Sequence, residues 1–420
     1  MGFERQVYHL HMLLQNKNFL FIWMARMISG LGDWIFLIAM PLYIFDITES
    51  TIATGSMFII QMLPRLLFGS IAGTFVDKLN KKWTLVIVDV VRAVALTLLF
   101  FVPVGQLWAF LVIAFIQNLV GTLFIPAHRS LLVATISRER LVEANSITVV
   151  SDNIIRIIGP SIGGALLGIA GVEIAIATDI FSYMISSVLL SLVAVKSSQQ
   201  KQKGAGTSLK QKWLEFWRNW WNGLKVVGTN HLYSTIFLMF SFTWLAQGMI
   251  NVLFVPYVIN EMGQTSVEFG WIESVQGIGG LIGGYMLLKL NKKIATFPLI
   301  ISSLLASGGL ALLQFNIPIL FFVFIMNAFL GITDVIYNVR LETLLQEQVP
   351  ENYMGRIFGA YNTLMALTML IGMSVASFLG EMMGTVMLLN ISALLFFLTG
   401  IVGYRALKQN IQVLRHGKND

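Results

Sequence analysis

The chain lacks cysteine altogether and has little charge of either sign. Without cysteine it cannot form a disulfide framework, a thiolate metal site or a cysteine nucleophile. Charged residues make up 12% of the 420 residues, against about 25% in an ordinary soluble domain. So few charged side chains cannot cover a soluble surface, and the composition therefore excludes a cytosolic enzyme or a nucleic-acid-binding domain.

Long apolar runs take the place of the missing charge. Hydrophobic residues make up 56% of the chain, and about 20 mostly apolar residues form a helix that crosses a bilayer. We expect an all-α membrane protein with twelve transmembrane helices, at residues 19–45, 52–76, 83–102, 108–128, 145–168, 174–195, 231–258, 267–290, 294–315, 318–340, 357–379 and 384–404.

The positive charges indicate how these helices are oriented, because cytoplasmic loops of membrane proteins carry an excess of Lys and Arg. The surplus of +7 is therefore an orientation signal and gives no support for a nucleic-acid partner. We expect a multi-pass protein of the plasma membrane, surrounded by lipid, with both termini in the cytoplasm. None of the 28 basic residues then lies in the predicted outer segments, which are residues 46–51, 103–107, 169–173, 259–266, 316–317 and 380–383.

A short repeat predicts how the spans are grouped. Residues 73–82 read GTFVDKLNKK and residues 284–293 read GYMLLKLNKK, with six of ten positions identical at an offset of 211. Two halves of this kind place a substrate site between them, near the midplane of the membrane. We expect two pseudo-symmetric six-helix halves with a linker and a tail in the cytoplasm, divided as residues 1–195, 196–230, 231–404 and 405–420.

The predicted linker has a flexible part and an amphipathic part. Residues 196–208 read KSSQQKQKGAGTS, which is typical of a flexible polar segment. The residues that follow predict an amphipathic helix in the inner headgroup layer, or alternatively a helix that binds a partner protein. Its apolar face consists of Trp213, Phe216, Trp217, Trp220, Trp221 and Leu224.

Short motifs lie within the predicted spans and at their ends. The inner loop after the second span contains Gly73, Asp77, Lys78, Lys81 and Lys82, and the fifth span contains Gly159, Pro160, Gly163 and Gly164. Others are Ser29-x-Leu31-Gly32-Asp33, Asp89-x-x-Arg92-Ala93, Pro126-Ala127-x-Arg129, Ala144-Asn145, and Gln346-x-x-Val349-Pro350 followed by Gly355-Arg356. Together and in this order they resemble the major facilitator superfamily, and within it the drug-exporter branch that includes macrolide efflux proteins and the enterobactin exporter.

The resemblance implies the major facilitator fold and a role for two of the motifs. In the inner loop, Asp77 would face the positive N-terminal end of the eleventh span and hold the two halves closed on the inside. A plain stop-transfer cluster of charges is the alternative. In the fifth span, the glycine-proline segment resembles the antiporter motif, which packs the halves together. A structural kink without bearing on transport direction is the alternative.

Charged residues inside the spans are costly and usually functional. Spacings of three and four residues place Asp89 with Arg92, and Asp152 with Arg156, on common helix faces, which predicts two structural ion pairs. Acids without such a partner are better proton carriers, because burial favours the neutral form of a carboxyl group. The first candidate is Asp33, about midway along the first span, with a buried hydrogen-bonded acid as the alternative.

Other polar residues of the spans complete a predicted proton-coupling and substrate cavity. Arg65 could bind an anionic substrate group or reach the headgroups, and Asp179 could instead lie near the outer headgroups. The full set is Asp33, Asp334, Glu273, Asp179, Arg65, Gln117, Asn118, Gln247, Asn251 and Asn362. We predict no metal site, because the pair His9 and His11 has no further ligands nearby.

The sequence therefore predicts a secondary active transporter that exports an amphipathic small molecule, of drug or macrolide type, by proton-coupled antiport and alternating access. A dedicated exporter of a siderophore or a lipid, and a proton-coupled importer, are the alternatives. No H-E-x-x-H or P-loop pattern appears, so we do not expect an enzyme. A passive channel would not need doubled halves. We expect a monomer that uses the proton gradient and no cofactor.

Overall fold

All regular structure in the described part of the chain is helical. The computed structural model describes residues 15–103, 105–195, 209–290 and 294–416. Its helices are α2 (Lys17–Thr48), α3 (Thr51–Lys78), α4 (Lys81–Thr97), η1 (Leu98–Phe101), α5 (Leu107–Gly121), α6 (Phe124–Thr135), η2 (Arg138–Arg140), α7 (Leu141–Ala165), η3 (Leu166–Ala170), α8 (Gly171–Ser191), α9 (Leu209–Thr229), α10 (His231–Pro256), η4 (Tyr257–Glu261), α11 (Ser266–Leu290), α12 (Thr296–Asn316), α13 (Leu320–Gln348), α14 (Glu351–Met383) and α15 (Thr385–His416).

The predicted spans coincide with these helices. Within the described residues, ten helical stretches are long and apolar enough to cross a membrane. They hold eleven of the twelve predicted spans, because the stretch 138–191 contains both α7 and α8. The span predicted at residues 267–290 is a helix, α11, but is not among the ten, since its glutamates and glycines lower its mean hydropathy. The prediction of an all-α membrane fold is confirmed.

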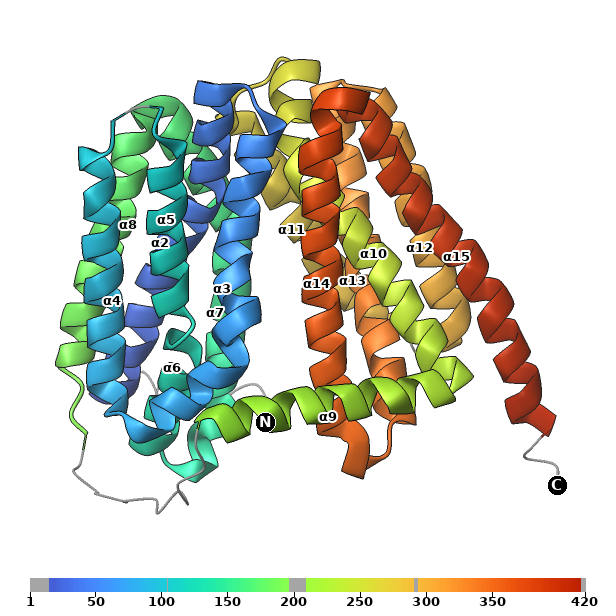
Figure 1. The fold of residues 1–420 in the computed structure, drawn as a ribbon, viewed down its shortest axis with the longest axis horizontal. Coiled ribbons are helices and arrows are strands. Elements are labelled where there is room, and N and C mark those ends of the chain that lie inside the picture. Colours follow the sequence, from blue (N-terminus) through green and yellow to red (C-terminus); the bar gives the residue numbers. More distant parts are fainter. Residues whose placement is uncertain (1–14, 104, 196–208, 291–293, 417–420) are drawn as a thin grey trace. The chain divides into compact units, whose positions relative to one another are not determined.

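The chain divides into two compact units, drawn in Figure 1. The first consists of residues 1–49, 56–203 and 265–274, and the second of residues 50–55, 204–264 and 275–420. Helix α3 therefore begins in the second unit and continues in the first, and α11 begins in the first and continues in the second. The domain boundaries predicted from the repeat stay a prediction.

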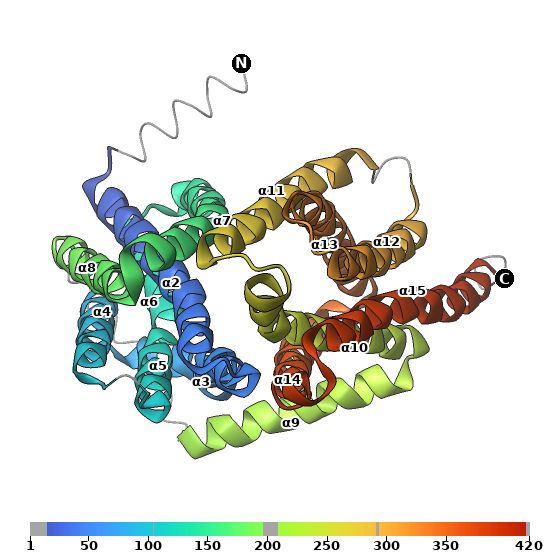
Figure 2. The same ribbon diagram turned by 90° about the horizontal axis from the view of Figure 1, so that it is seen from above.

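In the first unit, α2 packs against α7 and α8, and α4 packs against α8 (Figure 2). Helix α2 begins where the side chain of Asn16 accepts hydrogen bonds from the backbone of Asn18 and Phe19. The side chain of Asn18 then bonds both backbone groups of Ala194, just after α8. These contacts fix the lengthwise register of α2 against α8, and α2 and α8 carry most of the site described below.

In the second unit, α10 packs closely against α14, and α12 packs against α13 and α15. Helix α9 forms where the sequence predicts an amphipathic helix. It lies along α14 and α10 (Figure 2). Its Trp220 and Leu224 pack against the core of this unit, whereas Trp217 and Trp221 are 40% and 56% exposed. Part of the apolar face therefore binds neighbouring helices rather than headgroups.

Candidate functional site

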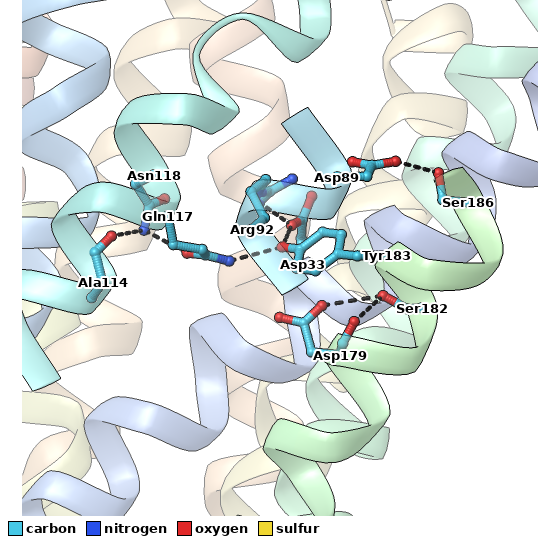
Figure 3. A network of polar contacts seen from close by, with 10 residues as sticks. All are labelled: Asp33, Asp89, Arg92, Ala114, Gln117, Asn118, Asp179, Ser182, Tyr183 and Ser186. Carbon is cyan, nitrogen blue, oxygen red and sulfur yellow. Dashed lines mark hydrogen bonds and ion pairs between the residues drawn. The ribbon is translucent and has the colours of Figure 1, made fainter. Parts of the chain in front are cut away.

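An ion pair joins two helices in the interior of the first unit. Asp33 lies on α2 and Arg92 on α4, and one terminal nitrogen of Arg92 lies 2.5 Å from Oδ1 of Asp33 (Figure 3). The side chain of Arg92 is 7% exposed and that of Asp33 is 32% exposed. The accessible end of this ion pair is therefore the carboxylate.

A chain of hydrogen bonds connects the ion pair to α8 and α5. The hydroxyl of Tyr183 donates to the same Oδ1 of Asp33 at 2.5 Å, and Nε2 of Gln117 donates to this hydroxyl at 2.8 Å. Asn118 in turn donates to Oε1 of Gln117 at 3.0 Å. The guanidinium carbon of Arg92 also lies 4.3 Å from the ring centre of Tyr183, a cation–π distance. Four helices thus hold Asp33 in one geometry.

Two further carboxyl groups lie fully buried beside this pair. Oδ2 of Asp89, on α4, accepts a hydrogen bond from Ser186 at 2.6 Å, and Oδ1 of Asp179, on α8, accepts one from Ser182 at 3.2 Å. Among the described residues, the second oxygen of each acid has no hydrogen-bond partner. Arg92 interacts electrostatically with Asp33, Asp89 and Asp179. We call these three acids with Arg92, Tyr183, Ser182, Ser186, Gln117 and Asn118 the buried polar network.

A glycine makes room for one of the buried acids. A Cβ atom on Gly32 of α2 would overlap Oδ1 of Asp179 and the hydroxyl of Ser182. The absence of a side chain at Gly32 therefore allows α8 to place a carboxyl group against the backbone of α2, one residue before Asp33. Small residues serve close helix approach of this kind in membranes.

Residues 22–373 and 236–410 match the family model described as Major Facilitator Superfamily. The chain belongs to the Major Facilitator Superfamily. It is accordingly a membrane transporter and not an enzyme.

Relatives within the superfamily are distant but match over most of their length. The uncharacterized MFS-type transporter YfiS of Bacillus subtilis (strain 168) is 24% identical over 92% of this chain and 92% of its own. Macrolide efflux protein A of Streptococcus pyogenes is 23% identical over 87% of this chain and 90% of its own. A solved structure of a bacterial homologue of the iron transporter ferroportin, in an inward-facing state, has a TM-score of 0.73. It covers 94% of this chain and 99% of its own at 16% identity, which shows the fold alone.

The prediction of two ion pairs, each within a single helix, is wrong. Arg92 pairs with Asp33 of α2 rather than with Asp89, and Asp152 pairs with Arg26 of α2, at 3.2 Å, rather than with Arg156. Spacing of three or four residues brings side chains to one helix face, but an arginine is long enough to reach a carboxylate on the facing helix. Asp33 is consequently not the unpaired acid that the sequence suggested.

The remaining predicted cavity residues divide into two groups. Gln117, Asn118 and Asp179 join Asp33 in the buried polar network, and Asp179 is fully buried against Gly32 of α2. Its depth relative to the outer headgroups stays a prediction. The other predicted cavity residues lie outside the buried polar network (Figure 3), and their roles stay predictions. In this second group Asn338 donates to Asp334 at 2.8 Å and Gln247 to Asn251 at 3.0 Å, Glu273 is partly exposed, and Arg65 and Asn362 are exposed.

The sequence predicted Asp179 of α8, but Ser182, Tyr183 and Ser186 of the same helix and the role of Gly32 were missed. Ser182 and Tyr183 follow Asp179 by three and four residues, and Ser186 follows Ser182 by four, which places all of them on one face of α8. This polar stripe is visible in the sequence and predicts an inward face. That Gly32 lies opposite it depends on the lengthwise register of α2 against α8, which no local pattern encodes.

The predicted gating loop of this transporter holds a helix end in place. Nζ of Lys81 donates to the carbonyl oxygens of Val76, Asp77 and Leu79, at 2.9, 2.8 and 3.1 Å, at the end of α3. The side chain of Asn80 caps the start of α4. A positive charge on the last carbonyl groups of a helix is favourable. The gating roles of Gly73, Asp77, Lys78 and Lys82 stay predictions.

We expect Lys81→Met to lower the free energy of unfolding by about 1 kcal/mol, because three charge-assisted hydrogen bonds at a partly exposed position are lost. Methionine keeps most of the apolar stem. The measurement is the thermal unfolding midpoint of the purified protein in detergent. Lys82→Met is the matched control and should unfold close to wild type; equal shifts in both variants would contradict the capping role.

The predicted antiporter-type segment packs α7 tightly within the first unit. A Cβ on Gly159 would lie 2.6 Å from Cβ of Trp34, and one on Gly163 would lie 3.1 Å from Cα of Ile35. Residues 159–163 also have the spacing G-x-S-x-G of hydrolase nucleophiles, which stand on a turn between a strand and a helix. Here Ser161 lies inside α7 and its hydroxyl bonds that of Ser274 at 2.6 Å. The segment therefore serves helix packing, and a role in antiport stays a prediction.

Proposed function

We propose that this transporter exports an amphipathic small molecule carrying a positively charged group, in exchange for protons and by alternating access. The observation that carries the proposal is the bonding of Asp33. Within the described part of the chain, both of its donors, Arg92 and Tyr183, bind Oδ1, and Oδ2 accepts no hydrogen bond. A carboxylate that is 32% exposed and has one oxygen available can receive either a proton or the cationic group of a substrate.

Competition at one oxygen couples the release of substrate to the binding of a proton. A proton that binds Oδ2 of Asp33 removes the negative charge that would hold a cationic substrate, and the substrate leaves. On the other side of the membrane, loss of the proton restores the negative charge. Charged groups held inside transmembrane segments commonly mark proton and substrate pathways.

The relatives support export and the sequence supports the orientation. Macrolide efflux protein A, at 23% identity over most of both chains, is named for efflux of macrolides. The predicted outer segments contain no Lys or Arg, which supports cytoplasmic termini in a plasma membrane. The exporter would then work as a monomer, driven by the proton gradient.

Inverted membrane vesicles with an imposed pH gradient test the proposal. We expect gradient-driven accumulation of at least one compound from a panel of lipophilic cations, macrolides and siderophores. In Asp33→Asn we expect accumulation to fall at least tenfold, because the variant can neither bind the cation nor release a proton.

The matched control is Asp46→Asn, which removes an exposed acid near the end of the same helix. It should transport as wild type does. Accumulation that is independent of the pH gradient would contradict proton coupling. Unimpaired transport of every compound by Asp33→Asn would contradict the role of Asp33.

A further inference from the structure

The buried polar network contains more negative groups than its single arginine can balance. Asp33, Asp89 and Asp179 surround Arg92, so full ionisation would leave a net charge of two negatives in the interior of the unit. Among the described residues outside the network, Arg26 also interacts electrostatically with Asp89, but it already pairs with Asp152 and therefore leaves the excess unchanged. An uncompensated buried charge is so unfavourable that the group takes up a proton instead.

The bonding shows which acid keeps its charge. Asp33 is the most exposed of the three and has the contact with the guanidinium of Arg92 and the hydroxyl of Tyr183. Asp89 and Asp179 are fully buried, and each accepts a single side-chain hydrogen bond, from a serine. One oxygen of each has no partner among the described residues. A carboxyl group in such surroundings is far better accommodated neutral than charged.

We propose that Asp89 and Asp179 form a second proton-binding site, holding two protons while Asp33 is ionised and paired with Arg92. The role of this site in transport rests on the proposed proton-coupled antiport. When a proton binds Asp33, Arg92 loses its partner. One of the buried acids then releases its proton and becomes the new partner of Arg92. One proton enters at Asp33 and one leaves from Asp89 or Asp179, so the charge of the network is zero before and after the exchange.

The unpartnered side of Arg92 fits this exchange. Its Nε is buried without a hydrogen-bond partner among the described residues, while its terminal nitrogen holds Asp33. Asp89 stands one turn earlier on the same helix, and Asp179 lies against Gly32, next to Asp33. Arg92 therefore has two alternative carboxyl partners close by.

Infrared spectroscopy of the purified, substrate-free protein at neutral pH tests the site directly. Protonated carboxyl groups absorb separately from carboxylates, and asparagine at the same position removes this absorption without changing the size of the side chain. We expect Asp89→Asn and Asp179→Asn each to remove part of the protonated-carboxyl band. Asp33→Asn should also remove part of it, because one buried acid must then ionise to pair with Arg92, whereas Asp33→Asn combined with Arg92→Gln should leave the band unchanged. Only variants that elute as monodisperse peaks in size-exclusion chromatography are compared. Ser186→Ala keeps Asp89 but removes its hydrogen-bond donor, so it should shift the band rather than remove it.

Loss of the band in Asp33→Asn combined with Arg92→Gln, or its persistence in either Asp89→Asn or Asp179→Asn, would overturn the assignment. An unchanged band in Asp33→Asn would overturn the proposed exchange of partners at Arg92. Transport assays test separately whether this proton-binding site serves the coupling of protons to substrate. We expect gradient-driven accumulation to fall at least tenfold in Asp179→Asn, with exchange in the absence of a gradient retained. Normal accumulation in both buried variants would overturn the coupling role. If wild-type transport ignored the pH gradient while the infrared result held, the proposed antiport would fail and the proton site would stand.

Discussion

Replacement of Arg92 by glutamine is expected to abolish transport and to cost about 3 kcal/mol of folding stability, the loss typical of a buried ion pair deprived of one partner. The arginine is the common partner of three acids, and it lies over the ring of Tyr183. Glutamine keeps part of the hydrogen bonding but supplies no charge. Asp33 then remains in the unit without its counter-charge and takes up a proton, so it can no longer exchange one.

The measurements are the thermal unfolding midpoint in detergent and transport in proteoliposomes. Arg156→Gln is the matched control, because Arg156 also lies within a predicted span but is exposed, and its loss should change the midpoint little. Arg92→Lys should retain stability better than glutamine, since it keeps the charge but not the planar guanidinium. The double variant Arg92→Gln with Asp33→Asn should recover part of the lost stability, because no charge is left unpaired. Wild-type transport by Arg92→Gln would contradict the central role of the ion pair.

The second large effect is expected from a single methyl group. Gly32→Ala places a Cβ where Oδ1 of Asp179 and the hydroxyl of Ser182 now lie, so α2 and α8 must separate or both side chains must move. Overpacking of this kind costs about 1–3 kcal/mol. Since the displaced groups belong to the buried polar network, we also expect transport to fall at least tenfold.

Gly30→Ala is the control on the same helix. Its added Cβ would meet only Cδ1 of Ile155, at an ordinary 3.5 Å. Alanine favours a helix over glycine by about 1 kcal/mol, so this variant should unfold at or above the wild-type midpoint. If the Gly32→Ala protein were as stable and as active as Gly30→Ala, the close approach of α8 to α2 would not be needed for stability or transport.

Much of the fold follows from local patterns. The twelve apolar stretches each coincide with helices, because the length needed to cross a bilayer is a local property of the sequence. The motifs, taken together and in their order along the chain, indicate the superfamily, which the family match establishes independently. Asn80 was visible as part of a motif, but its use as the cap of α4 appears only where the chain turns between α3 and α4.

The candidate site is less predictable, and the reason can be seen in Arg92. Sequence spacing offers Asp89 as its partner, three residues away, whereas the structure provides Asp33, 59 residues away. The spans contain several acids that could pair with Arg92. Which of them does so depends on which side chains face each other across a helix interface. That choice is made by close approaches such as that of α8 at Gly32, which set the register of one helix against the next.

The sequence by itself determined that this protein is an all-α membrane transporter of a known superfamily and which few charges its spans retain, because span length and motif order are read along the chain. Only the tertiary structure decided how those charges are paired: Asp33 with Arg92 and Tyr183, and Asp89 and Asp179 buried beside them with one serine each. Electrostatic partnership depends on distance in space, and in a helical bundle the nearest opposite charge lies on the facing helix.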